Sequence, residues 1–115
     1  MIQKIIDNRY SNEFRTRIGL PERNTSPEIL ATLAQDEEWE VRYRVAKNPN
    51  TTLETLALLA KDEEWIVRGF TVTNSNIIFD CLIELLQDEN LDVRKTALRH
   101  PRVPDEYKML IFMNI

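Results

Sequence analysis

The sequence predicts an all-α protein, built as a solenoid of short helix-pair repeats. Residues 26–51 and 52–77 are identical at 13 of 26 aligned positions, and residues 78–103 continue the same 26-residue period. Within each unit the apolar residues follow helical spacing, and no long segment alternates as a strand would. A fixed period without insertions is typical of solenoids, because each unit buries its apolar side only by stacking on its neighbours.

Each unit is expected to begin with a short helix. Thr25-x-x-Glu28 and Thr51-x-x-Glu54 match the capping box, in which a hydroxyl and a carboxylate satisfy backbone N–H groups at a helix start. Pro27 falls in the first turn, where its missing donor has no cost. An apolar stripe follows in every unit: Leu30, Leu33 and Ala34, then Leu56, Leu59 and Ala60, then Leu82, Leu85 and Leu86.

A second helix is expected to follow in every unit. Asp36, Asp62 and Asp88 are predicted to end the first helix and to N-cap the second. The second helix then has one buried pair per unit: Val41 and Val45, Val67 and Thr71, and Val93 and Ala97. It is expected to stop near Asn48-Pro49, Asn74-Ser75 and His100-Pro101.

The whole chain, residues 1–115, is expected to form one repeat domain. Its predicted parts are an N-terminal partial or capping repeat at 1–25, full repeats at 26–51, 52–77 and 78–103, and a C-terminal half repeat at 104–115.

The composition excludes several kinds of functional site. Two glycines are too few for phosphate-cradling loops, and one histidine with one cysteine cannot form a zinc or iron–sulfur centre, so neither a metal nor a cofactor is expected. The lone Cys81 forbids an internal disulfide, and no apolar run is long enough for a signal peptide or a membrane span. We therefore expect a cytoplasmic protein with no membrane contact. The net charge of −4 argues against a general nucleic-acid binder.

The motif D-E-E-W-x-V-R, together with N-P-N-T and L-A-x-D, resembles the leucine-rich repeat variant family, a short relative of HEAT-like repeats. The resemblance covers roughly residues 15–111. It implies a right-handed α-α superhelix of about four 26-residue repeats that serves as a protein-interaction scaffold. Some members of the family carry a cysteine-rich iron–sulfur segment, and this chain lacks those cysteines.

HEAT-like relatives share an Asp-x4-Val-Arg spacing that this chain repeats in each unit. The resemblance implies a ladder in which each arginine bridges to the acid or turn of an adjacent unit. Charge-assisted Arg–carboxylate bonds mainly fix geometry, so these residues are interpreted as structural, with no catalytic residue and no enzyme activity expected. The predicted ladder consists of Asp36, Arg42, Asp62, Arg68, Asp88 and Arg94.

A candidate binding surface emerges when the second helices are projected at about 100° per residue. In helical solenoids such helices usually line the concave face. Ile66 and Phe70 form an apolar centre with basic residues around it, as many protein-binding patches do. In an alternative interpretation, Phe70 turns inward because Thr71 has replaced a core valine. The candidate partner-binding residues are Tyr43, Arg44, Lys47, Ile66, Gly69, Phe70, Lys95 and Arg99.

Trp39 and Trp65 occupy one repeat position, and Leu91 replaces them in the third unit. This replacement favours a packing role over ligand stacking. His100 stands where two units have asparagine beside the helix end, which favours a turn residue over a base or metal ligand.

These observations predict a non-catalytic scaffold that binds another protein. Two alternatives belong to other classes: a small nucleic-acid-binding HEAT-like module that uses the basic residues, and an accessory or lyase-like subunit of an enzyme. The final segment, 107–115, is too apolar all round for an exposed last helix. Either Met109, Phe112 and Ile115 fold onto the stack, or this helix mediates self-association.

Overall fold

The computed structural model describes residues 25–114, with side chains described as far as Met109. These residues form only α-helices and no strand, which confirms the all-α prediction for this part of the chain. The predicted capping repeat at 1–25 lies almost wholly outside the described residues. The helices are α3 (Pro27–Leu33), α4 (Trp39–Lys47), α5 (Leu53–Leu59), α6 (Trp65–Thr73), α7 (Phe79–Leu85), α8 (Leu91–Leu98) and α9 (Asp105–Asn114).

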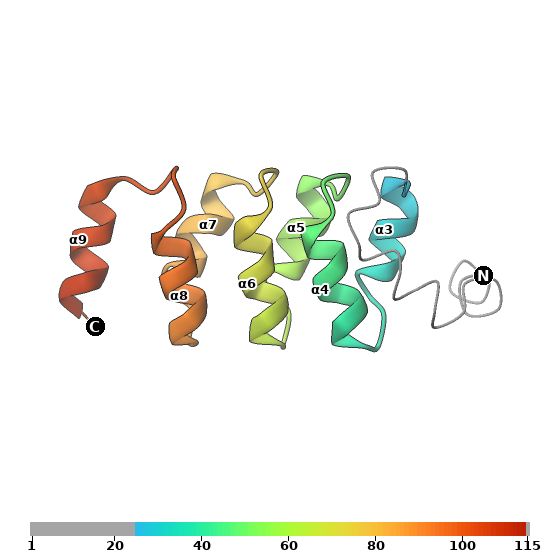
Figure 1. Ribbon diagram of the computed structural model, residues 1–115, viewed down its shortest axis with the longest axis horizontal. Helices are drawn as coiled ribbons and strands as arrows, with labels where there is room; N and C mark the ends of the chain where they lie inside the picture. The colour runs from blue at the N-terminus through green and yellow to red at the C-terminus, as the bar shows by residue number, and fades with distance from the viewer. Residues whose placement is uncertain (1–24, 115) are drawn as a thin grey trace.

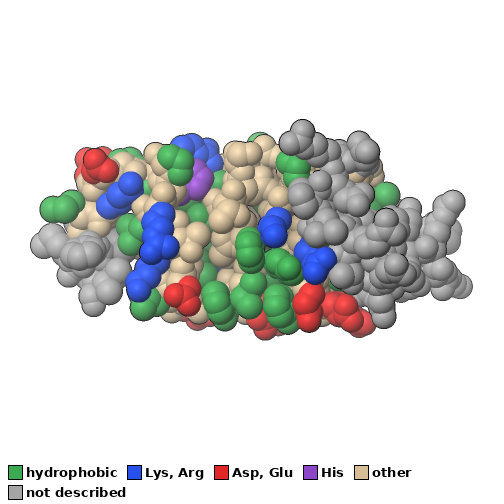
Figure 2. Space-filling view, in the orientation of Figure 1, with side chains coloured by type: hydrophobic (Ala, Val, Ile, Leu, Met, Phe, Trp, Pro, Cys, Tyr) green, Lys and Arg blue, Asp and Glu red, His purple; other side chains and the backbone are tan. Residues whose placement is uncertain are grey.

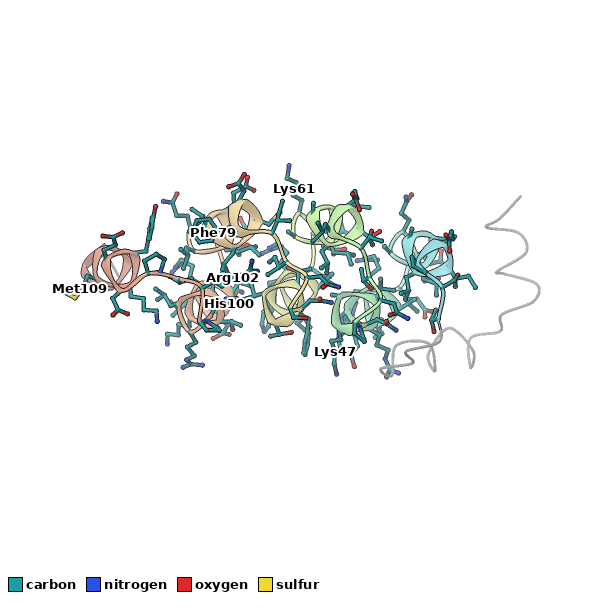
Figure 3. All side chains as sticks on the ribbon, turned by 90° about the horizontal axis from the view of Figure 1, so that it is seen from above. Lys47, Lys61, Phe79, His100, Arg102 and Met109 are labelled. Carbon is teal, nitrogen blue, oxygen red and sulfur yellow. The ribbon has the colours of Figure 1, made fainter. Side chains whose placement is uncertain are left out.

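The helices alternate between two rows. In Figure 1, α4, α6 and α8 stand side by side in front, with α5 and α7 behind them and α9 at the end. Figure 3 shows the same two rows from above. The fold measures 50 × 22 × 20 Å along its principal axes. None of the helices in residues 25–114 is both long and apolar enough to cross a bilayer.

The core fills the space between the two rows. The leucines of the first helices and the paired residues of the second helices are buried as the sequence predicts, with Leu30, Val45 and Val67 all at 0% exposure. Leu59 and Val67 pack in the same cluster as Leu30, so neighbouring units bury apolar surface against each other. Full burial of each such side chain contributes about 1.5–3 kcal/mol.

The N-caps of α3 and α5, the first helices of their units, fall one residue later than predicted. Ser26 Oγ accepts the Ile29 N–H at 3.2 Å, and Thr52 Oγ1 accepts the Thr55 N–H at 3.2 Å. The capping role expected for Thr51 is wrong because its buried hydroxyl turns inward and donates to Val45 O at 2.6 Å. Thr51 thereby closes the end of the preceding helix.

The aspartates that follow each first helix do not N-cap the second helix, contrary to prediction. The N-caps are Glu38, Glu64 and Asn90, two residues further on. One carboxylate oxygen of each aspartate accepts the backbone N–H of that residue instead. The Asp62 Oδ1–Glu64 N distance, for example, is 2.9 Å. Each aspartate therefore braces the turn between the two helices of its unit.

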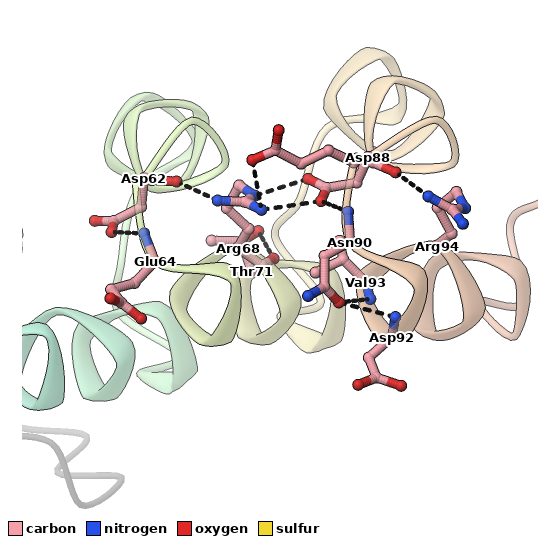
Figure 4. Close-up of polar contacts among 10 residues, drawn as sticks. Asp62, Glu64, Arg68, Thr71, Asp88, Asn90, Asp92, Val93 and Arg94 are labelled. Carbon is pink, nitrogen blue, oxygen red and sulfur yellow. Dashed lines mark hydrogen bonds and ion pairs between the residues drawn. The ribbon is translucent and has the colours of Figure 1, made fainter.

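Arginines on the second helices join each unit to the next at the aspartate turns (Figure 4). Arg68 donates from Nε and Nη2 to the two carboxylate oxygens of Asp88 at 2.7 and 3.0 Å, and from Nη1 to Asp62 O at 2.7 Å. Arg42 makes the same three bonds to Asp62 and Asp36 O. Arg94 keeps the bond within its own unit, to Asp88 O at 2.7 Å.

The Arg68–Asp88 pair is buried, with the two side chains 9% and 7% exposed. The hydrogen bond to Asp88 raises the pKa of Arg68, although burial alone lowers it. Arg68 therefore stays charged, and its Nε, Nη1 and Nη2 groups all donate hydrogen bonds. Removing either partner of such a buried pair destabilises the fold, because the remaining charge is left buried without compensation.

Asparagines join the units at the opposite ends of the second helices. Asn74 Nδ2 donates to Ala46 O at 2.8 Å and to Asn48 O at 2.9 Å. Asn76 Nδ2 donates to Thr51 O at 3.2 Å, and Asn50 Nδ2 donates to the equivalent Thr25 O at 3.1 Å. Hydrogen bonds thus link α4 and α6 to adjacent units at both ends of each helix.

We expect Arg68→Ala to lower the free energy of unfolding by about 3 kcal/mol, because it leaves the Asp88 carboxylate buried without its charge partner. Urea denaturation followed by circular dichroism measures the change. Glu89→Gln is the matched control, since this carboxylate is 88% exposed and lies 3.7 Å from Arg68 Nη2. The control is expected to change stability by less than about 1 kcal/mol. Equal stability of the Arg68→Ala variant and the parent would contradict a structural role.

Candidate protein-binding surface

The predicted binding residues all lie on the outward side of α4, α6 and α8, which is called the front face below. Figure 2 shows hydrophobic side chains gathered over α4 and α6, with Lys and Arg side chains beside them and over α8. The exposed members are Lys47, Lys95 and Arg99. The half-buried members are Tyr43, Arg44, Ile66, Gly69 and Phe70.

Three aromatic rings and a lysine form one contact group, the aromatic cluster, between α4 and α6. The ring centroids of Trp39 and Tyr43 are 5.8 Å apart, and those of Tyr43 and Phe70 are 5.1 Å apart. Lys47 Nζ lies 5.2 Å from the Phe70 centroid and 5.7 Å from the Tyr43 centroid. A cation over a ring at an exposed site contributes about 0.5–1 kcal/mol, so Lys47 helps to order the rings.

Phe70 is half-buried on the front face, and it also packs against the core cluster that contains Val45 and Val67. Its half-buried ring contacts Tyr43 across the two helices. Thr71 occupies the core position itself at 0% exposure, because its hydroxyl donates to Arg68 O at 2.6 Å and leaves its methyl group for packing. The threonine therefore replaces valine without leaving a gap for Phe70.

Gly69 lies beside the aromatic cluster and is not required by the backbone. It does not adopt a positive φ. A Cβ added to it would meet only Val93 Cγ2 at 3.9 Å, an ordinary van der Waals distance. The fold therefore tolerates alanine at this position, although glycine costs about 1 kcal/mol in a helix interior.

Trp39, Trp65 and Leu91 form an apolar row at the first residues of α4, α6 and α8. Trp39 packs against the core as predicted, but Trp65 is 41% exposed and Leu91 is 40% exposed. The predicted packing role therefore fails for Trp65 and Leu91, the first residues of α6 and α8, which leave a large part of their surface exposed. These apolar surfaces extend the front face towards the helix N-termini.

The structure brings Tyr43, Lys47 and Phe70 into direct contact. It also places Arg44 Cζ 5.5 Å from the Tyr43 centroid, whereas the other two predicted cations lie elsewhere. Lys95 and Arg99 lie on α8 and at its end, outside the aromatic cluster. Exposed acids share the same face, Glu40 on α4 and Asp92 on α8. The front face is thus an apolar centre with a rim of mixed charge.

A pocket of about 520 Å³ opens between the C-terminal ends of α6 and α8, and sequence reasoning missed it. Its lining residues are Val72, Thr73, Ser75, Thr96, Arg99, His100, Pro101 and Arg102. Figure 3 shows His100 and Arg102 beside the end of α8. Partial burial, with the nearby Arg102 charge, lowers the pKa of His100. A signal was present in the sequence, because His100 and Arg102 stand where the preceding unit has Asn74 and Asn76.

We expect Gly69→Ala to raise the free energy of unfolding by up to about 1 kcal/mol, since alanine fits the space and favours the helix. Thermal or urea denaturation provides the measurement. Thr73→Ala, exposed on the same helix, serves as a comparison in which no glycine is removed. A loss of stability in Gly69→Ala would show that the backbone needs glycine there.

Among the residues that the structure describes, no group of histidine, cysteine and carboxylate side chains is placed to hold a metal ion. In comparisons with known proteins, no family model, no curated protein and no solved structure matches this chain. Function is therefore inferred from the side chains and their geometry.

Proposed function

We propose that this protein is a non-catalytic interaction scaffold that binds a partner protein through the front face. We also propose that the chain is a right-handed solenoid of about four repeats of the leucine-rich repeat variant or HEAT-like type. The two alternating helix rows support this architecture (Figure 1), as does the recurrence of the Arg–Asp bridge one unit later.

The aromatic cluster is the observation that carries the binding proposal. Aromatic side chains are enriched in the centres of protein interfaces, where a few of them supply most of the binding energy. Tyr43 and Phe70 are already held in place by each other and by Lys47, so little side-chain entropy is lost when a partner covers them. Half-buried Ile66 and exposed Trp65 enlarge the apolar area.

The charges support a protein partner over the two alternatives. A nucleic acid would meet the exposed carboxylates of Glu40 and Asp92 on the same face, and these repel phosphates. The repeated Asp62 and Asp88 carboxylates are occupied by arginines, which favours a structural role over catalysis. An accessory enzyme subunit has no observation of its own in its favour.

Substitution at the centre of the front face tests the proposal. We expect Ile66→Glu to weaken partner binding about 30-fold or more, because it places a charge at the apolar centre of the interface. Affinity capture from the native host identifies the partner, and titration with the purified partner measures the loss. Leu58→Glu on α5 is the matched control, since Leu58 is 51% exposed on the other row. Retained binding by Ile66→Glu, or equal loss in both variants, would exclude the front face.

The last helix supports a second, separate proposal of self-association through residues 107–115. Met109 is 64% exposed and Tyr107 is 36% exposed, so the expectation that Met109 folds onto the stack is wrong. Figure 3 shows Met109 at the outer end of the stack, where no further helix covers α9 in the described chain. Phe112 and Ile115 lie outside the described side chains.

Sedimentation equilibrium checks the self-association. We expect the parent chain to dimerise with a dissociation constant in roughly the micromolar to millimolar range, typical of a small apolar contact, and Met109→Glu to stay monomeric. Leu53→Glu on α5, where the leucine is 47% exposed, removes a similar apolar group from another surface and should leave dimerisation unchanged. A monomeric parent chain at the highest attainable concentration would end this proposal.

A further inference from the structure

The pocket between the ends of α6 and α8 exists because the third unit lacks the asparagine that closes the preceding interface. Between α4 and α6, Asn74 Nδ2 donates to the carbonyl oxygens of Ala46 and Asn48 and fills the space. His100 holds the equivalent position beside α8. Its Nδ1 accepts the Arg102 N–H at 3.1 Å, so the neutral ring keeps a single donor on Nε2. The carboxamide bridge is therefore not repeated here, and an opening takes its place.

The charged groups around the opening are hydrogen-bond donors, whereas the Thr73 and Thr96 hydroxyls donate to backbone oxygens of their own helices. None of the eight lining residues carries a carboxylate, whereas Arg99 and Arg102 are both exposed cations. Arg102 is held in position because its Nη2 donates to Ile77 O, the bond that Asn76 makes to Thr51 O one unit earlier. Ser75 adds a hydroxyl. The lining therefore favours an anionic ligand.

The negative ends of the α6 and α8 dipoles oppose an anion here, but their effect is smaller than that of the two arginine charges. Two helix C-termini carry about half a negative charge each, which sums to about one unit. Arg99 and Arg102 supply two full positive charges to the same pocket. The balance stays positive even while His100 is neutral.

We propose that this pocket binds a phosphomonoester. A carboxylate can be satisfied by one guanidinium fork, whereas a phosphomonoester offers three terminal oxygens and nearly two negative charges to two arginines. Val72 and Pro101 provide an apolar wall for the carbon atoms of the ester. The volume of about 520 Å³ lies within the usual range for small-ligand sites. The site is separate from the aromatic cluster and does not depend on the proposed scaffold function.

His100 is a built-in spectroscopic probe of this pocket, because it is the only histidine in the sequence. Proton NMR of the His100 imidazole can follow a titration with phenyl phosphate, with phenol as the uncharged analogue. We expect a saturable shift with a dissociation constant below about 1 mM for phenyl phosphate and no saturation with phenol. A short neutral peptide containing phosphoserine forms a second arm. Tighter binding of either phosphomonoester supports the proposal and identifies its source as a small molecule or a phosphorylated protein segment.

Two variants separate charge recognition from folding. Arg102→Asn removes the charge but introduces the residue that makes the equivalent backbone bond in the preceding unit, and Arg99→Gln removes the other charge. Each is expected to weaken phenyl phosphate binding about tenfold. Lys61→Gln is the control, because Lys61 is an exposed cation just after α5, on the other row of helices and away from His100 (Figure 3). Failure of both phosphomonoesters to saturate, unchanged affinity in Arg99→Gln and Arg102→Asn, or equal weakening in Lys61→Gln would each overturn the proposal.

Discussion

The buried Arg–Asp bridge between adjacent units is the interaction on which the rest of the structure depends. Asp88 accepts two bonds from Arg68 of the preceding unit and also braces its own turn through the Asn90 N–H at 2.8 Å. The same arginine reaches back to Asp62 O in its own unit. One carboxylate thus sets the turn inside a unit and the spacing between units, and the burial of both charges makes any other spacing costly.

This bridge leaves the front face available for function. The arginines and aspartates hold the N-terminal ends of the second helices, and Asn74 and Asn76 hold the opposite ends. Both ladders use only the inward positions and the turns, although Tyr43 and Phe70 also pack against the core from the front face. The outward positions are therefore less constrained by the fold, and one repeat position holds residues as different as Tyr43, Gly69 and Lys95. Differences between units are expected where a partner is recognised.

The sequence predicts those features that depend on local pattern. The leucine stripe and the buried valines such as Val45 follow from helical spacing and are confirmed. The cap positions do not follow from pattern, because Thr51 and Thr52 both offer a hydroxyl and a tertiary contact to Val45 O decides between them. The exposure of Trp65 and the pocket beside His100 depend likewise on packing between units far apart in the sequence.

Two positions hold residues that stabilise the fold less than another residue would at the same place. Gly69 has room for a side chain yet keeps a residue that costs about 1 kcal/mol in a helix. His100 replaces an asparagine whose two bonds at Asn74 are each worth about 1 kcal/mol. Folding alone favours alanine and asparagine at these sites. Such losses are typical of positions kept for function, and the two lie at the aromatic cluster and the pocket. Lost stability and distinctive side-chain chemistry thus coincide in the same two regions of the molecule.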